Sequence, residues 1–474
     1  MSFRLMIREN RGDRIAYTFC TTEGIPMTSR HDSSAGVFAR FVHSQAFGSA
    51  LLLAATIAAL LLANSRWSDI YFGYLHTKVG LAWGPATFAL SVQHWINDLL
   101  MVVFFFVVGL EIKRELVAGQ LSTFKKAVVP VAAALGGMIV PALVYAWFNP
   151  AGDAAAGWGI PMATDIAFAL GVLALFGARV PVGLKVFLTA LAIADDLGAV
   201  LVIAIFYTDQ ISWPGLAVAA AFLAAIALAN RSRVGHPVVY VALALGVWAG
   251  VLASGIHATI AGVLVAMVVP VRSRLNPREF LELTDDRLSR LRSAQLTRDS
   301  LLEDRWQLDA ISDLRQVASA MRPPGLALEE TLHPFVAFAI LPLFAFFNAG
   351  VAVSGNILDA LRHPVGLGVV LGLVVGKQVG VTVFTWLAVT LARAERPEGV
   401  SWSQIYGGAC LAGIGFTMSM FVDQLAYSDP ENVDRAKIAI LMASVVAAAW
   451  GAVVLAARLP RQKVQPSVTV PPKS

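Results

Sequence analysis

Twelve apolar stretches with the period of a helix run along this chain, and they constrain the fold more than any other feature. None shows the alternating ten-residue pattern of a membrane β-strand. Because backbone polar groups must be satisfied internally in lipid, the stretches predict a bundle of helices. They cover residues 46–64, 94–112, 127–147, 160–178, 184–207, 211–229, 237–253, 256–271, 334–352, 364–392, 405–423 and 436–457.

The composition supports the same class. Of 474 residues, 57% are hydrophobic and only 14% are charged, against about 25% charged in a typical soluble protein. These values argue against a soluble globular domain, a disordered chain and a nucleic-acid binder. The chain is therefore expected to be an all-α polytopic membrane protein.

The basic residues predict the orientation. If the N-terminus is inside, four short cytoplasmic loops carry ten Lys and Arg residues, and the outer loops carry five. Cytoplasmic loops of membrane proteins carry the excess of positive charge. We therefore expect a cytoplasmic tail at 1–43, a membrane domain at 44–458 and a second cytoplasmic tail at 459–474.

Two segments stand outside the spans. The segment 65–93 contains two β-prone runs around Gly84-Pro85, which predicts an external β-hairpin. The segment 272–332 holds 21 of the 67 charged residues of the chain. It predicts one or two amphipathic helices in a charged cytoplasmic insertion, ending at Pro323-Pro324.

Four charged residues lie well inside apolar stretches: Asp165, Asp195, Asp196 and Lys377. Charges inside a membrane are costly and mark functional sites. A buried ion pair that only holds helices together is the structural alternative. Asp195 and Asp196 are adjacent, so they project about 100° apart on a helix and can flank one cavity. Two such carboxylates cannot both ionise cheaply, so one can exchange a proton for a cation.

Two of the stretches are interrupted. In the fourth, Gly159 and Pro161 precede the run 162–165 that ends at Asp165, and the eleventh contains the loosened run 413–417 with a threonine. The two stretches cross the membrane in opposite senses, which is the pattern of an inverted-repeat transporter. If the breaks meet, four helix ends face one another, and Asp165 and Lys377 have the charges to offset them. Four glycines, one every fourth residue, predict close packing around Lys377: Gly368, Gly372, Gly376 and Gly380.

Six motifs in order along residues 44–457 resemble the NhaA-type sodium/proton antiporters, a family in which the inverted-repeat arrangement is known. They are GLEIKREL at 109–116, ATDIAFALGVLAL at 163–175, LAIADDLGAV at 191–200, SGIHATIAGV at 254–263, LHPFVAFAILPLFAFFNAG at 332–350 and GIGFTMSMF at 413–421.

The resemblance implies twelve spans, in which the third to fifth and the tenth to twelfth are inverted repeats. It implies that Na⁺ or Li⁺ leaves the cytoplasm of a bacterium through its inner membrane while H⁺ enters, without a cofactor. Asp195 and Asp196 would form the cation and proton site, Thr164 and Asp165 the helix crossing, and Lys377 the buried lysine.

The resemblance also implies partners. The hairpin at 65–93 matches the external dimer contact of the family, so a homodimer in membrane lipid is expected, with no nucleic acid.

The pH response of the family is associated with a cytoplasmic cluster. Glu111 and Glu115 match this cluster at the end of span two, and Glu329 and His333 match it at the start of span nine. The chain departs from the family pattern in two ways: Glu330 stands where the family often has histidine, and the insertion at 272–332 is longer than the usual loop. His257, in the motif SGIHATIAG, could titrate near neutrality or be a structural histidine.

Four other functions compete with the antiport that the resemblance implies. An intramembrane aspartyl protease also needs two membrane aspartates, but the YD and GxGD motifs that such enzymes share are missing, as is the HExxH of a metalloprotease. A passive channel would not need titratable acids beside interrupted helices. A proton-coupled carrier of another small solute is the alternative that residue chemistry alone leaves open. No enzymatic activity is expected.

Overall fold

A computed structural model describes residues 34–83, 86–208, 211–232, 237–273, 276–293, 305–352 and 357–459. The chain divides into two units, Met1–Ser44 and Gln45–Ser474, and the second contains the membrane domain. Most of the two predicted tails, residues 1–33 and 460–474, lies outside the described residues, so the tail predictions stay predictions.

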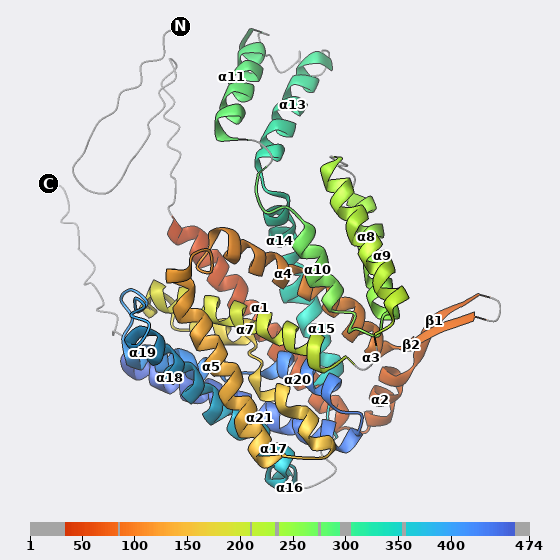
Figure 1. The fold of residues 1–474 in the computed structure, drawn as a ribbon, viewed down its shortest axis with the longest axis vertical. Coiled ribbons are helices and arrows are strands. Elements are labelled where there is room, and N and C mark those ends of the chain that lie inside the picture. Colours follow the sequence, from red (N-terminus) through yellow and green to blue (C-terminus); the bar gives the residue numbers. More distant parts are fainter. Residues whose placement is uncertain are drawn as a thin grey trace, which may run out of the picture. The chain divides into compact units, whose positions relative to one another are not determined.

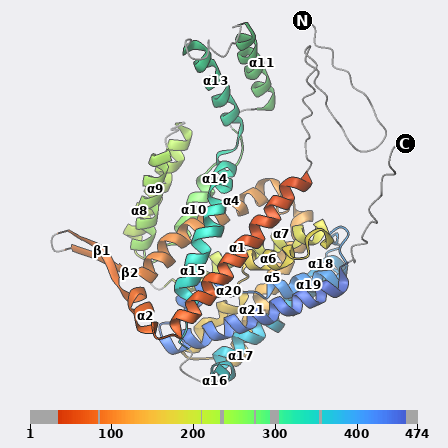
Figure 2. The same ribbon diagram turned by 180° about the vertical axis from the view of Figure 1, so that it is seen from behind.

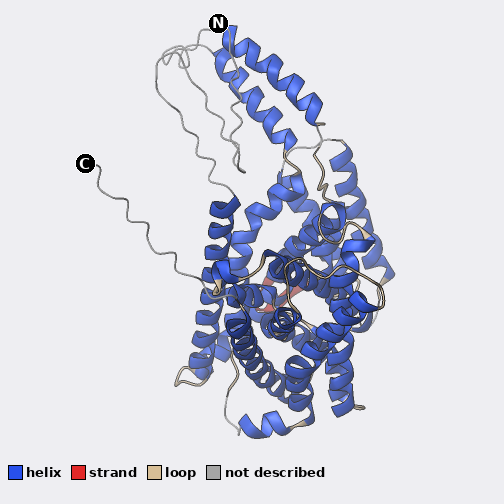
Figure 3. Cartoon of the chain, turned by 90° about the vertical axis from the view of Figure 1, so that its left-hand side faces the viewer, coloured by secondary structure: helices blue, strands red, loops and turns tan. Residues whose placement is uncertain are grey.

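The described chain is almost entirely helical (Figure 3). Its first part contains α1 (Ser34–Ala63), α2 (Ser68–His76), α3 (Val92–Trp95), the π-helical turn η1 (Ile96–Leu100), α4 (Met101–Ala118), α5 (Phe124–Phe148), the 3₁₀ segment η2 (Asp153–Met162), α6 (Ile166–Ala174), the 3₁₀ turn η3 (Gly177–Arg179), α7 (Val182–Phe206), α8 (Trp213–Arg231), α9 (Pro237–Ala253) and α10 (Ile260–Val268).

The second part contains α11 (Pro277–Ser293), α13 (Arg305–Met321), α14 (Pro324–Phe335), the π-helical turn η4 (Val336–Ile340), α15 (Leu341–Asn348), α16 (Ile357–Arg362), α17 (Pro364–Leu371), the π-helical turn η5 (Gly372–Gly376), α18 (Lys377–Thr390), α19 (Trp402–Ala412), α20 (Phe416–Ala426) and α21 (Pro430–Arg458).

Within the described ranges, nine helical segments are long and apolar enough to span a membrane, and the pair α19–α20, bent by 45°, makes a tenth. This confirms an all-α polytopic fold. The other two predicted stretches, 237–253 and 256–271, form shorter helices. The second begins late because Gly255 turns the chain out of its helix with a φ of 82°, so α10 starts only at Ile260.

The predicted glycine stripe packs closely against α5. A Cβ atom on Gly380 would lie 2.0 Å from the carbonyl oxygen of Gly136, and one on Gly376 would lie 2.9 Å from Cα of Pro141. Only glycine permits this approach of two backbones. Elsewhere α8 and α9 lie side by side (Figure 1), and α19 packs along α21 (Figure 2).

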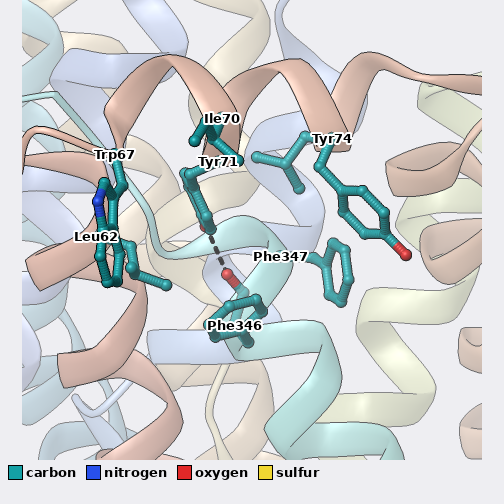
Figure 4. A pocket seen from close by; sticks show the side chains of 8 residues that line it. Leu62, Trp67, Ile70, Tyr71, Tyr74, Phe346 and Phe347 are labelled. Atoms are coloured by element: carbon teal, nitrogen blue, oxygen red, sulfur yellow. Dashed lines mark hydrogen bonds between the residues drawn. The ribbon is translucent and has the colours of Figure 1, made fainter.

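The segment predicted as a hairpin contains both a helix and a hairpin. Strands β1 (Lys78–Trp83) and β2 (Ala86–Ser91) are antiparallel, with Lys78 opposite Ser91. Helix α2 precedes them and was not predicted. Its Tyr71 hydroxyl donates to the carbonyl oxygen of Phe346 at 2.5 Å, beside an apolar pocket of about 290 Å³ (Figure 4). Burial raises the pKa of Tyr71 to about 12, so it stays neutral.

We call the end of the bundle that carries these strands the hairpin end, and the opposite end the loop end. The chain reaches the hairpin end where α5, α7 and α20 finish, and the loop end where α4, α6 and α21 finish. A hydrogen bond supports this assignment of helix ends to the two ends of the bundle. Asn149, which follows α5, donates to the carbonyl oxygen of Pro364 at the start of α17 at 3.0 Å.

The charged insertion forms two helices, α11 and α13, in its described residues, while 294–304 lie outside the description. An ion pair between Arg287 and Asp313 joins the two helices. The backbone N–H of Gly325 donates to the carbonyl oxygen of Pro270 at 3.0 Å. The membrane helices on either side of the insertion therefore come together at its base.

Candidate functional site

The two interrupted spans cross at their breaks. Residues 163–165 are extended between η2 and α6, and residues 413–415 separate α19 from α20. The Thr164 hydroxyl donates to the carbonyl oxygen of Ala412 at 2.8 Å. The backbone N–H of Asp165 donates to the carbonyl oxygen of Ile414 at 2.7 Å. Each break thus satisfies backbone groups that the other leaves free, as lipid requires.

Asp165 caps two half-helices at once. One carboxylate oxygen accepts from the backbone N–H of Phe168 at 2.9 Å, at the start of α6. The other accepts from the backbone N–H and the hydroxyl of Thr417 at 3.2 and 2.5 Å, at the start of α20. Helix starts carry partial positive charge, so this buried carboxylate lies where two positive ends meet.

Lys377 lies beside the crossing and is 0% exposed. Its Nζ donates to Oδ2 of Asp195 at 2.8 Å and also to the carbonyl oxygen of Met162. Met162 ends η2, where helix carbonyls carry partial negative charge. A Cβ on Gly137 would lie 3.5 Å from Cε of Lys377, so close packing of α5 holds the lysine stem in place.

Asp195 and Asp196 lie on α7 and are each 1% exposed. The two carboxylates have different surroundings. Asp195 pairs with Lys377 through one oxygen. Among the residues that the structure describes, Oδ2 of Asp196 and Oδ1 of Asp195 have no hydrogen-bond partner. An oxygen of this kind is available to a hard cation or to a proton, both of which bind carboxylates.

The electrostatic surroundings of Asp196 are mostly negative. Asp195, Glu111 and Asp165 repel its charge, and Lys377 attracts it. The lysine is already paired with Asp195. An added positive ion at Asp196 would therefore relieve repulsion among several buried acids.

Arg114 joins the predicted acidic residues at the loop end. It donates to Glu329 at 2.6 Å and lies 3.8 Å from both Glu111 and Glu115. His333 is also close enough to interact electrostatically with Arg114. The structure thus gathers four of the five residues predicted for the pH response around one guanidinium.

His257, the fifth, lies elsewhere. Its Nε2 donates to the carbonyl oxygen of Tyr207 at 2.6 Å, at the hairpin end of α7. Sequence reasoning missed Arg114 and Thr417 as contact residues. Arg114 could have been found from its spacing, because it lies three residues after Glu111 on one helix face.

Crossing half-helices inside a helical membrane bundle, with buried acids and a lysine at the crossing, define a secondary transporter. The sequence profile described as Na⁺/H⁺ antiporter 1 matches residues 39–455. The chain belongs to this family.

Curated relatives agree with this assignment. The Na⁺/H⁺ antiporter NhaA of Acidithiobacillus ferrooxidans is 47% identical over 416 residues, which cover 87% of this chain and 95% of that protein. NhaA of Wolinella succinogenes is 46% identical over 87% of this chain and 91% of its own. NhaA 2 of Helicobacter hepaticus is 43% identical over 90% of this chain and 97% of its own.

Proposed function

We propose that this protein is a secondary antiporter that exports Na⁺ or Li⁺ in exchange for protons, with Asp195 and Asp196 as the ion site. The observation that carries the proposal is the buried carboxylate oxygen of Asp196, which has no hydrogen-bond partner in the described part of the chain and lies beside other acids. Membership of the Na⁺/H⁺ antiporter 1 family supports the choice of ions.

Coupling follows from competition at Asp196. The carboxylate binds either a cation or a proton, because one bound positive charge removes the attraction for the next. Lys377 keeps Asp195 compensated. Asp165 and Lys377 offset the helix ends at the crossing, which lets two half-helices meet in the membrane and reposition around the site.

The orientation we propose puts the loop end in the cytoplasm of a bacterium and the hairpin end outside the inner membrane. The excess of Lys and Arg in the loops at the loop end supports it. Both termini are then cytoplasmic. Na⁺ binds from the loop end and leaves at the hairpin end, while protons move the opposite way.

Glu111 is the proposed link between the pH response and the ion site. It interacts electrostatically with Arg114, Glu329 and Glu115 and also repels Asp196. A change in protonation within the loop-end cluster therefore changes the potential at Asp196. His257 lies outside this cluster, at the carbonyl oxygen of Tyr207, and its part in the pH response stays a prediction.

The test of the function is ion-driven proton flux in proteoliposomes, with Na⁺, Li⁺ and K⁺ added across a pH series. Proton release driven by Na⁺ or Li⁺ is the expected result. Release driven by none of the three cations would contradict the proposal and favour the alternative, a proton-coupled carrier of another solute.

Replacing residues 275–322 by a short flexible linker is expected to leave exchange intact, with at most a shifted pH profile. The insertion lies apart from the crossing, and Pro270 and Gly325 are already hydrogen bonded at its base, so a short linker can close the gap. Exchange rates of the full chain and the shortened chain are compared in the same vesicles. Complete loss of transport by a correctly inserted protein would contradict this expectation.

Replacing the strands at 78–91 by a short linker is expected to weaken self-association and to leave transport measurable. The hairpin offers free edges that a second copy can pair. The backbone N–H of Val92 donates to the carbonyl oxygen of Thr77 at 3.0 Å, so the cut ends are adjacent and α2 can stay. Dimer fractions of both proteins are measured in detergent by light scattering, and an unchanged fraction would argue against a hairpin-mediated dimer.

A further inference from the structure

Another deeply buried carboxylate lies away from the ion site and the crossing, at Asp423 in α20. Its side chain is 0% exposed. Throughout the described ranges, neither of its oxygens accepts a hydrogen bond. An ionised carboxylate buried in this way is costly. Asp423 must therefore hold a proton or balance its charge against a nearby cation.

Two polar contacts to η2 fix the position of Asp423. Four residues before it, the Ser419 hydroxyl donates to the carbonyl oxygen of Ile160 at 2.8 Å. Four residues after it, the Tyr427 hydroxyl donates to the carbonyl oxygen of Ala154 at 3.3 Å. Residues four apart share one face of a helix. Asp423 thus lies between two contacts that join α20 to the 3₁₀ half of the other broken span.

Helix α20 connects this place to the crossing. It begins with Thr417 bound to Asp165 and ends at the hairpin end. Six residues separate Thr417 from Asp423, which is about 9 Å along a helix. Asp423 therefore lies between the crossing and the hairpin end.

The charged groups that face Asp423 come from α21. Lys437, which is 7% exposed, attracts it, and Asp434 repels it. Lys437 attracts both carboxylates. One lysine thus serves two acids, and its single charge cannot neutralise both at once. The surplus negative charge favours uptake of a proton by the more deeply buried acid.

The nearby tyrosines are neutral hydrogen-bond donors. Tyr145 and Tyr427 are hydrogen bonded to each other through their hydroxyls, and Tyr145 also donates to the carbonyl oxygen of Ala154 at 2.8 Å. Burial raises the pKa of Tyr427 above its usual range. Neither phenol releases its proton at physiological pH, so the carboxylate is left as the group that titrates.

We infer that Asp423 is a second proton-exchanging carboxylate, which binds protons that come from water at the hairpin end. The proton forms an O–H bond on one carboxylate oxygen and leaves again to water or toward the crossing, without any electron transfer. A proton needs one oxygen, whereas a metal cation needs several. The neighbouring hydroxyl and carbonyl oxygens are already hydrogen bonded to one another. The part of Asp423 in ion exchange rests on the proposed antiport, but proton binding does not.

Proton binding is tested by acid–base titration of the purified protein in sodium-free detergent. Between about pH 6 and pH 9, where an exposed aspartate is already ionised, Asp423→Asn is expected to titrate one proton fewer than the wild type, and Asp423→Glu to restore it. Asp434→Asn is the matched control: it removes a charge beside the same lysine, but at an exposed position. An Asp423→Asn protein that titrates as many protons as the wild type would overturn the inference and make Asp423–Lys437 a permanent ion pair.

If Asp423→Asn does not fold, the double variant Asp423→Asn/Lys437→Gln takes its place, because it leaves no unpaired buried charge. The role in transport is tested in proteoliposomes by varying the pH on the hairpin side alone. Asp423→Asn should slow exchange several-fold at alkaline pH, where protons are scarce, and match the wild type at acidic pH. Equal rates over the whole range would overturn this role. Since the proton count is measured without sodium, failure of the antiport proposal would not affect it.

Discussion

Asp196→Asn is expected to abolish both Na⁺ binding and Na⁺-driven proton release. The substitution keeps the size and polarity of the side chain but removes its charge and its titration. The site must offer an anionic oxygen to a hard cation, and the same oxygen must accept a proton. Asn can do neither. Because the affected Oδ2 makes no hydrogen bond within the described structure, folding should be largely unaffected.

The wild type should also show competition between the two ions. As pH falls, protons occupy the carboxylate and apparent Na⁺ affinity decreases, by up to about tenfold per pH unit once the proton form dominates. Binding is measured by isothermal titration calorimetry, and exchange by a pH-sensitive dye in vesicles. Asp359→Asn, at an exposed carboxylate in α16, is the control. A well-folded Asp196→Asn protein that exchanges Na⁺ for H⁺ near the wild-type rate would refute the assignment.

The buried charges of the crossing could be predicted from sequence because their surroundings make them conspicuous. Four charged residues each interrupt a long apolar run: Asp165, Asp195, Asp196 and Lys377. A charged side chain within the membrane is costly, so its presence indicates a functional site. The breaks near Pro161 and at 413–415 could be predicted for a similar reason, since glycine and proline loosen a helix. Local composition was therefore sufficient to predict which residues are unusual.

The pairing of these residues could not be predicted in the same way. From the sequence, Lys377 could offset helix ends or belong to a buried ion pair, and the structure shows contacts of both kinds. Which carboxylate the lysine contacts depends on how α18 and α7 both pack against α5. That packing is set by contacts between residues far apart in sequence, for which a single sequence holds no direct signal.

The burial of charged residues near the ends of spans was even harder to predict from sequence. Asp423 closes the eleventh apolar stretch and Lys437 opens the twelfth, where charged residues are ordinary and usually face water. Their burial follows from tertiary packing of α20 and α21. Helix α2 was missed for a related reason. It is short, and its stability depends on burying Tyr71 and Leu75 against the bundle more than on its own propensity.

Lys377→Ala is expected to lower both thermal stability and transport. Removing one partner of a buried ion pair leaves the other charge uncompensated, which typically costs about 3–5 kcal/mol. Here the charge left uncompensated is the carboxylate of Asp195, which lies 2.8 Å from Lys377 Nζ, and both side chains are at most 1% exposed. The carbonyl oxygen of Met162 loses its donor as well. Thermal unfolding in detergent, followed by tryptophan fluorescence, measures the effect against Lys126→Ala, an exposed lysine of α5.

Two further variants separate charge from packing at Lys377. Arginine keeps the positive charge, so Lys377→Arg should retain more stability than Lys377→Ala. The double variant Asp195→Asn/Lys377→Ala removes both charges and should recover part of the stability that Lys377→Ala loses, since contacting residues are not additive. Equal melting temperatures for the wild type and Lys377→Ala would show that the ion pair contributes nothing to the fold. Lys377 would then act on transport alone, through its positive charge beside Asp195 and the end of η2.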